Sequence, residues 1–157
     1  MLTELQKEVL IYLIRSLEES GVEFQVSGGL AAMAYGARRP LYDIDLEIYK
    51  KDVEKVRNLF KDYITEDWNH LAEGPEDQFD LWMMTLSVRG VPVDINQVEG
   101  SRVRPVGGAW VPQPETMHPQ LLEFEGIKLP VQDKDELIGY KRILARDTDL
   151  EDVDQIT

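Results

Sequence analysis

Three carboxylates in this sequence could share one task. Asp43 and Asp45 stand two residues apart in YDIDLEIY, and Asp94 stands in VPVDIN. Both segments alternate polar and apolar residues as β-strands do, and side chains two apart on a strand point to one face. Asp43 and Asp45 could therefore reach one cation, and Asp94 on an adjacent strand could complete a site for Mg²⁺ or Mn²⁺. Such ions activate a hydroxyl and stabilise charge on a transferring phosphoryl group.

A diglycine upstream of these acids is a candidate phosphate site. The strand-like segment VEFQVS leads into Gly28 and Gly29, and the following LAAMAYG favours a short helix. Backbone N–H groups at a turn from strand to helix favour phosphate, and glycine lets a triphosphate approach the backbone closely.

Composition argues against several other chemistries. The chain has 157 residues, no cysteine, and two histidines, His70 and His118, that are far apart. Disulfides and cysteine nucleophiles have no basis here, and a histidine-built zinc site is not supported. The formal charge of −13 argues against nucleic acid as a partner and permits a small molecule, favouring a cationic one. Neither a signal peptide nor an apolar run of membrane length is recognisable, so we expect a cytoplasmic protein with no membrane contact.

A single domain of residues 1–157 is expected to position these groups. Periodicity predicts helices over 3–20, 52–63 and 133–146, and a capping box at 148–151 opens a last helix with little room to pack. Alternation predicts strands over 22–27 and 42–49, and hairpins over 79–98 and 124–131. The acidic stretch from Glu66 to Asp77 around Gly74-Pro75, and the Pro- and Gly-rich stretch 101–119, are predicted to be loops.

The joint pattern resembles the nucleotidyltransferase superfamily related to DNA polymerase β. The signature of that superfamily is a strand, a GG or GS turn, a short helix and a D-x-D strand. It stands here as VSGGLAAMAYGARRPLYDIDLEI, followed by VPVDIN and by GYKRILARDTDLEDV near the end. The sequence is similar to the lincosamide and aminoglycoside nucleotidyltransferases, which have an arginine four residues before the first Asp, as Arg39 stands before Asp43 here. It is also similar to the small nucleotidyltransferases of toxin–antitoxin and abortive-infection systems, which share the same elements. The resemblance implies an α/β (α+β) fold: a mixed, mostly antiparallel sheet flanked by helices, with an active edge formed by the strands of Asp43 and Asp94.

The resemblance also implies a role for each matching residue. Asp43 and Asp45 would bind Mg²⁺ or Mn²⁺, and Asp94 would be the third metal carboxylate or the general base. The residues implied in binding the triphosphate of an NTP are Ser27, Gly28, Gly29, Arg39 and Lys141. For Lys141 the interpretation as an ordinary surface lysine is equally open.

Several neighbouring residues have simpler expected roles. Glu47 continues the acidic face of its strand and is expected to be solvated. Asp149 and Asp152 are expected to complement the dipole of the last helix from its first turn. Trp82-Met83-Met84 is expected to be strand core rather than a platform for base stacking.

The implied reaction is transfer of a nucleoside monophosphate from an NTP to a hydroxyl of a small-molecule acceptor. Two alternatives remain open: modification of a protein partner, as in toxin–antitoxin modules, and a non-catalytic nucleotide-binding module of the same fold. The chain is short for a complete acceptor pocket, so we also hypothesise a homodimer.

Overall fold

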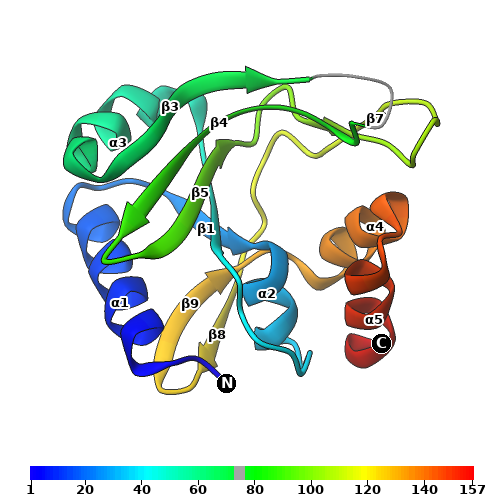
Figure 1. The fold of residues 1–157 in the computed structure, drawn as a ribbon, viewed down its shortest axis with the longest axis horizontal. Helices are drawn as coiled ribbons and strands as arrows, with labels where there is room; N and C mark the ends of the chain where they lie inside the picture. The colour runs from blue at the N-terminus through cyan, green and yellow to red at the C-terminus, as the bar shows by residue number, and fades with distance from the viewer. Residues whose placement is uncertain (73–76) are drawn as a thin grey trace.

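The computed structural model describes residues 1–72 and 77–157 and combines helices with one large sheet (Figure 1). The helices are α1 (Glu4–Glu19), α2 (Gly28–Ala34), α3 (Val53–Leu59), α4 (Lys134–Leu144) and α5 (Asp147–Ile156). The strands are β1 (Phe24–Ser27), β2 (Ile44–Ile48), β3 (Ile64–Leu71), β4 (Phe79–Val88), β5 (Val91–Gln97), β6 (Arg102–Val103), β7 (Val111–Pro112), β8 (Gln120–Phe124) and β9 (Ile127–Val131).

The strands pair in the order β7-β6-β4-β5-β2-β1-β9-β8, with β3 attached to β4. The pairs β2–β5 and β1–β9 are parallel and the other pairs are antiparallel, which confirms the predicted mixed, mostly antiparallel sheet. The expectation that β2 and β5 form an edge of the sheet is wrong, however, because both are inner strands. On its other side β2 pairs with β1, and on its other side β5 pairs with β4.

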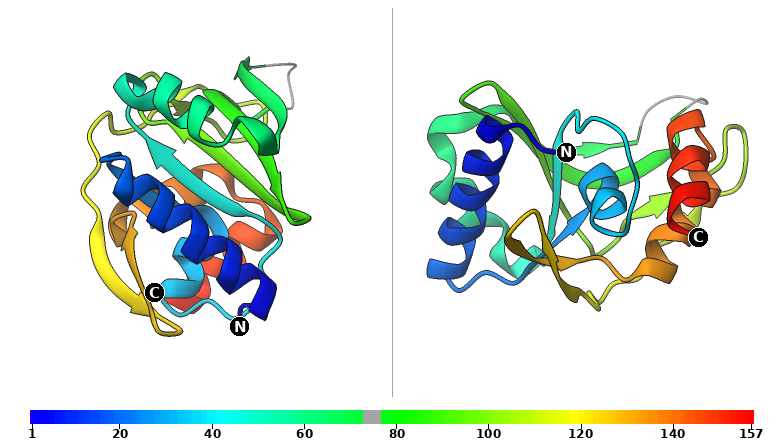
Figure 2. Two further views of the ribbon diagram at one scale, coloured as in Figure 1. Left: turned by 90° about the vertical axis from the view of Figure 1, so that its left-hand side faces the viewer. Right: turned by 90° about the horizontal axis from the view of Figure 1, so that it is seen from below.

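The alternation along the strands divides the sheet into a core face and a polar face. Ile44, Leu46 and Ile48 of β2 are fully buried and belong to the same core cluster as Leu13 and Leu17 of α1. Asp45 and Glu47 therefore lie on the opposite face of β2. Figure 2 shows α1 lying along the sheet, while α4 and α5 lie side by side at the other end of the molecule.

Part of the predicted acidic loop is a strand. Ile64–Leu71 forms β3, which pairs antiparallel with β4 and is interrupted by register shifts. None of its side chains is fully buried, and the exposed and half-buried positions do not alternate. The strand therefore has no apolar alternation that the sequence could reveal, and its backbone pairing with β4 defines it instead. The rest of that prediction, from Glu73 to Glu76 around Gly74-Pro75, lies outside the described residues. The predicted loop over 101–119 contains the short strands β6 and β7.

The C-terminal helix is integrated into the molecule, contrary to expectation. Val153 and Ile156 of α5 are buried in the core, and the helix packs against both α4 and α2. Over the described ranges 1–72 and 77–157, no helix has the length and apolar character needed to cross a membrane.

Candidate active site

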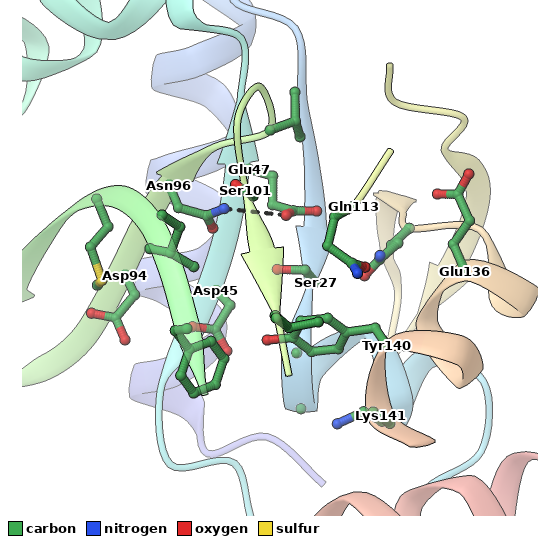
Figure 3. Close-up of a pocket in the computed structure, with 18 of the residues that line it drawn as sticks. Ser27, Asp45, Glu47, Asp94, Asn96, Ser101, Gln113, Glu136, Tyr140 and Lys141 are labelled. Carbon is green, nitrogen blue, oxygen red and sulfur yellow. Dashed lines mark hydrogen bonds between the residues drawn. The ribbon is translucent and has the colours of Figure 1, made fainter. Parts of the chain in front are cut away.

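The three predicted acids come together on the polar face of the sheet. In the parallel register of β2 and β5, Asp45 lies directly beside Asp94, and Asp43 immediately precedes β2. One carboxylate oxygen from each residue can be chosen so that all three lie within 4.8 Å of one another. Figure 3 shows Asp45 and Asp94 projecting from these adjoining strands.

Burial and mutual repulsion disfavour the ionised form of the carboxyl groups in this cluster. Burial raises the pKa of Asp45 well above its ordinary value, and the charges of Asp43 and Asp94 raise it further. Burial also raises the pKa of Asp94, although the Thr85 hydroxyl opposes this by donating a hydrogen bond to Asp94 Oδ1 at 2.9 Å. Three close carboxylate oxygens in such an environment are suited to a hard divalent cation, which would offset their repulsion.

Gly28 is required because the carboxylate of Asp45 lies against it. Ser27 pairs with Asp45 across β1 and β2, which brings Gly28 alongside the Asp45 side chain. A Cβ atom on Gly28 would lie 2.1 Å from Asp45 Oδ2, and the φ angle of Gly28 is +60°. Both the close approach and the left-handed backbone favour glycine.

Gly29 has a corresponding contact with Arg39. A Cβ atom on Gly29 would lie 2.7 Å from a guanidinium nitrogen of Arg39. The guanidinium is held there by Asp152 of α5, whose two oxygens accept hydrogen bonds from Nε at 2.8 Å and Nη2 at 3.0 Å. Arg39 therefore lies beside the diglycine, as a phosphate-binding residue would need to.

Lys141 is a buried member of an ion network rather than a surface lysine. Its Nζ atom lies 2.9 Å from Asp152 Oδ2 and 3.4 Å from Asp149 Oδ1, and the residue is 2% exposed. Arg146 Nε also contacts Asp149, at 2.6 Å. Asp149 and Asp152 are therefore buried partners of the basic residues. Asp149 also has the expected role in the first turn of α5, where it accepts a hydrogen bond from the backbone N–H of Arg146 at 3.2 Å. For Asp152 the expectation of a role mainly in the helix dipole is wrong.

The charge network determines the protonation of Asp152. Burial raises the pKa of this carboxyl group, but hydrogen bonds from Arg39 and Lys141 outweigh burial and hold the pKa below its ordinary value. Asp152 therefore stays ionised and keeps both cations in place at neutral pH.

The predicted residues all line one pocket of about 440 Å³. This volume lies within the range typical of small-molecule sites. The sequence-predicted residues that line it are Ser27, Gly28, Gly29, Arg39, Asp43, Asp45, Asp94 and Lys141.

The same pocket contains polar residues that sequence reasoning did not select. Glu47 was expected to be solvated, but it lies in the pocket and accepts hydrogen bonds from the Gln25 and Asn96 amides. Burial raises the pKa of Glu47, and these two hydrogen bonds oppose the rise. Its strand alternation with Asp45 was the available signal. Tyr140 of α4 also lines the pocket, and burial raises the pKa of its phenol.

The side chains of Trp82, Met83 and Met84 on β4 lie in different environments. Trp82 is 42% exposed and its ring stacks on His70 with centroids 4.9 Å apart, so the expected core role is wrong for Trp82. Met84 is fully buried in the core, whereas Met83 faces the pocket.

Solved structures similar to this chain are nucleotidyltransferases. A candidate nucleotidyltransferase from Thermotoga maritima is 20% identical with a TM-score of 0.75, over 96% of this chain and 91% of that one. The lincosamide antibiotic adenylyltransferase LnuA, solved with lincomycin bound, is 17% identical with a TM-score of 0.66, over 99% of both chains. The antibiotic-resistance factor ANT(2″)-Ia, solved with adenylyl-2″-tobramycin, is 13% identical with a TM-score of 0.61, over 94% of this chain and 86% of that one.

Neither a family model nor a curated protein sequence matches this chain. At these low identities the structural likeness concerns the fold, which is the nucleotidyltransferase fold in all three cases. The relationship predicted from the diglycine and D-x-D pattern is confirmed at that level.

Proposed function

We propose that this protein is a metal-dependent nucleotidyltransferase that moves a nucleoside monophosphate from an NTP to a hydroxyl of a small-molecule acceptor. The observation that carries the proposal is the junction of two features in one pocket. The carboxylates of Asp43, Asp45 and Asp94 converge there, and Gly28 brings the backbone of the diglycine turn against Asp45.

The three aspartates are the proposed ligands of Mg²⁺ or Mn²⁺. Their oxygen donors suit these hard cations, and their mutual repulsion would be relieved by a positive charge. When bound, the metal neutralises charge on the reacting phosphate and lowers the pKa of a coordinated hydroxyl.

The remaining pocket residues hold the triphosphate in this proposal. Ser27, Gly28 and Gly29 offer it a hydroxyl and backbone N–H groups, and no side-chain capping bond occupies the Ser27 hydroxyl. Arg39 supplies positive charge from beside the diglycine and Lys141 supplies it from the wall of the same pocket, while Asp152 keeps both side chains oriented.

The transfer conserves atoms and charge. The acceptor hydroxyl oxygen forms a bond to the α-phosphorus, the bond from the α-phosphorus to the bridging oxygen breaks, and pyrophosphate leaves. We assign Asp94 as the group that takes the hydroxyl proton, since Thr85 donates a hydrogen bond to Oδ1 and orients the carboxylate.

A small-molecule acceptor is favoured over a protein partner by the shape of the site. The pocket is a concave volume of about 440 Å³, and LnuA and ANT(2″)-Ia were solved with small antibiotics or their adenylylated forms. ATP is the proposed donor because LnuA is an adenylyltransferase and ANT(2″)-Ia was solved with an adenylylated antibiotic.

The test is transfer of radiolabelled AMP from ATP in the presence of Mg²⁺ to a panel of hydroxyl compounds that includes lincomycin and tobramycin. Acceptor-dependent pyrophosphate release that is lost in Asp43→Asn/Asp45→Asn supports the proposal. Binding of Mg·ATP without transfer to any small molecule or to lysate proteins would favour the non-catalytic module. Labelling of a protein alone would favour the protein-modifying alternative.

The hypothesised homodimer is tested separately. A monomer mass that does not change with protein concentration, measured by light scattering, would reject it.

A further inference from the structure

The side of the pocket beyond Asp94 is apolar. Asp94 lies on β5, and the sheet continues from β5 to β4, which pairs with both β3 and β6. Five apolar residues of these three strands, which we call the apolar wall, line the pocket. They are Leu71 of β3, Phe79, Leu81 and Met83 of β4, and Val103 of β6.

The apolar wall lies on the side from which an acceptor would arrive. Along the sheet, the diglycine follows β1, the aspartates lie on or beside β2 and β5, and the wall belongs to the strands beyond β5. In phosphoryl transfer the attacking and leaving oxygens are roughly in line with the phosphorus. If pyrophosphate leaves over the diglycine, the acceptor hydroxyl therefore enters from the side of the wall.

A polar cluster lies on the other face of these same strands. Its members are His70 of β3, Asp80 of β4 and Arg102 of β6, and each is next in the sequence to a residue of the apolar wall. Neighbouring side chains on a strand point to opposite faces of the sheet, so the cluster is directly behind the wall. Asp80 and Arg102 stand opposite each other in the pairing of β4 with β6.

Asp80 joins the other two members of the cluster. Its Oδ2 atom accepts hydrogen bonds from Arg102 Nε at 2.7 Å and from Nη2, and its Oδ1 atom lies 2.5 Å from His70 Nε2. A carboxylate can only accept, so His70 is the donor in this contact. Burial raises the pKa of Asp80, but the hydrogen bonds from His70 and Arg102 outweigh burial and hold the pKa below its ordinary value. Asp80 is 6% exposed, so these contacts are shielded from water.

The backbone by itself gives β6 little support. Arg102 and Val103 make up the whole strand, which pairs with β4 and with β7 through these two residues. The Arg102 guanidinium also lies 5.2 Å from the centre of the Trp110 ring, in the segment that leads to β7. The contact between Asp80 and Arg102 therefore restrains β6 and this segment together.

We propose that Asp80 is a positioning residue for the acceptor. By binding His70 and Arg102 on the outer face of the sheet, it fixes β3 and β6 relative to β4 and so holds the apolar wall in place. The inference rests on the proposed function for the direction from which the acceptor enters. It deepens that function by assigning an apolar surface to the acceptor, next to the hydroxyl that reacts.

The experiment compares Asp80→Asn with wild type, using benzyl alcohol as a probe that carries a hydroxyl beside an apolar ring. The variant keeps the shape of the side chain and removes its charge. The side chains of His70 and Arg102 are each 45% exposed, so water can solvate them when the carboxylate is gone, and we expect the variant to fold. Binding is measured on full-length protein labelled with ¹³C in its Leu and Val methyl groups.

We expect benzyl alcohol to shift the methyl resonances of Leu71, Leu81 and Val103 saturably in wild type. The dissociation constant should be at least fivefold larger in Asp80→Asn. Mg·ATP affinity, measured by calorimetry, should change less than twofold, because the diglycine and its basic neighbours belong to other elements. A purely structural role would not separate the two affinities in this way.

The matched control is Asp67→Asn, which removes a carboxylate from an exposed ion pair with Arg57 on the same strand as His70. It should leave both affinities unaltered. If Asp80→Asn did not fold, Arg102→Gln would break the same contact from its exposed side and should weaken benzyl alcohol binding alike.

Three results would overturn the proposal: no methyl response in wild type, equal benzyl alcohol affinity in wild type and Asp80→Asn, or a parallel loss of Mg·ATP affinity. If wild type bound benzyl alcohol at the wall but did not bind Mg·ATP, the proposed function would fail. The role of Asp80 in holding the wall would then still be decided by the comparison of the two proteins.

Discussion

At the scale of single residues, contacts of a few atoms define this site. The side chain of Asp45 occupies the space where a Cβ atom of residue 28 would lie, so the diglycine and the D-x-D motif constrain each other directly. Gly28 is therefore needed for the geometry of the acidic cluster.

Gly28→Ala tests this coupling. The left-handed φ angle alone costs an alanine about 1–2 kcal/mol, and the contact with Asp45 should add to that cost and displace the carboxylate. The matched control is Gly21→Ala, which has φ of +69° and no atom within 4 Å of the new Cβ. We expect urea denaturation to show a larger loss for Gly28→Ala, together with weaker Mg²⁺ binding. Equal losses with unchanged Mg²⁺ affinity would contradict the coupling.

Asp94→Asn tests the division of labour among the aspartates. If Asp94 chiefly accepts the hydroxyl proton, the variant should keep most NTP affinity and lose about 10²–10⁴-fold in turnover. Calorimetry measures the affinity, and pyrophosphate release with an identified acceptor measures turnover. Loss of NTP affinity as complete as in Asp43→Asn/Asp45→Asn would show that metal binding, rather than proton transfer, is the main role of Asp94. Retention of both properties would remove it from the site.

At the scale of elements, α5 is the part that completes the pocket on the side of Arg39 and Lys141. Asp149 and Asp152 are both buried, and they bind basic residues from α4 and from the segment before β2. The helix therefore joins two otherwise separate elements, so its removal would leave Lys141 buried without its partners.

Asp152→Asn should be strongly destabilising because it removes the carboxylate that binds Arg39 and the nearer of the two carboxylates that bind the buried Lys141. Breaking a buried ion pair from one side typically costs about 3–5 kcal/mol. The exposed Asp154→Asn on the same helix is the control and should change the free energy of unfolding by less than about 0.5 kcal/mol. Urea denaturation at pH 7 distinguishes the two variants. A loss as small as that of the control would show that the network contributes little.

The lowered pKa of Asp152 also predicts a pH dependence. Its contribution to stability is present above the ordinary Asp pKa of about 3.9 and is lost as pH falls through the lower pKa of the folded state. The wild-type protein should therefore lose more stability than Asp152→Asn when the pH is lowered from 5 to 3. Parallel losses in the two proteins would contradict the assignment.

At the scale of the whole molecule, the chain carries a formal charge of −13 and collects several carboxylates in one pocket. Repulsion within such a cluster opposes the compact state unless cations bind. The folded protein is thus expected to be stabilised by the same ions that its proposed activity uses.

Thermal unfolding with EDTA and with Mg²⁺ tests this expectation. Mg²⁺ at 100 times its Kd should stabilise the wild-type protein by about 2.7 kcal/mol. Asp43→Asn/Asp45→Asn should be at least as stable as wild type in EDTA and should lose the response to Mg²⁺. Glu18→Gln/Glu19→Gln on the exposed face of α1 changes the net charge equally and should respond as wild type does. An undiminished Mg²⁺ response in the aspartate variant would reject the metal site.

Local pattern is sufficient to predict the main elements and much of the candidate site. Alternation with a period of two determines which side chains share a face, so the sequence alone separates Asp45 from the core residues Ile44 and Leu46. The same rule fails for β3, because a polar strand paired with β4 has no apolar signature. The rule also does not predict that Glu47 lies in a pocket rather than in open solvent. The other residues that line this pocket come from α4 and from the segment after β5, which are far from β2 in the chain.

What the sequence determined by itself is local: glycines at a turn, acids on one face of a strand, and caps at helix ends. Only the tertiary structure decided that β2 and β5 are parallel neighbours inside the sheet, which sets Asp45 beside Asp94. It also decided that Asp152 holds Arg39 across 113 positions of chain, and that Gln25 is buried with an oxygen that no described residue pairs. The physical reason is that periodicity reflects the nearest turns of the backbone, whereas pairing order, burial and ion pairs depend on which distant segments pack together.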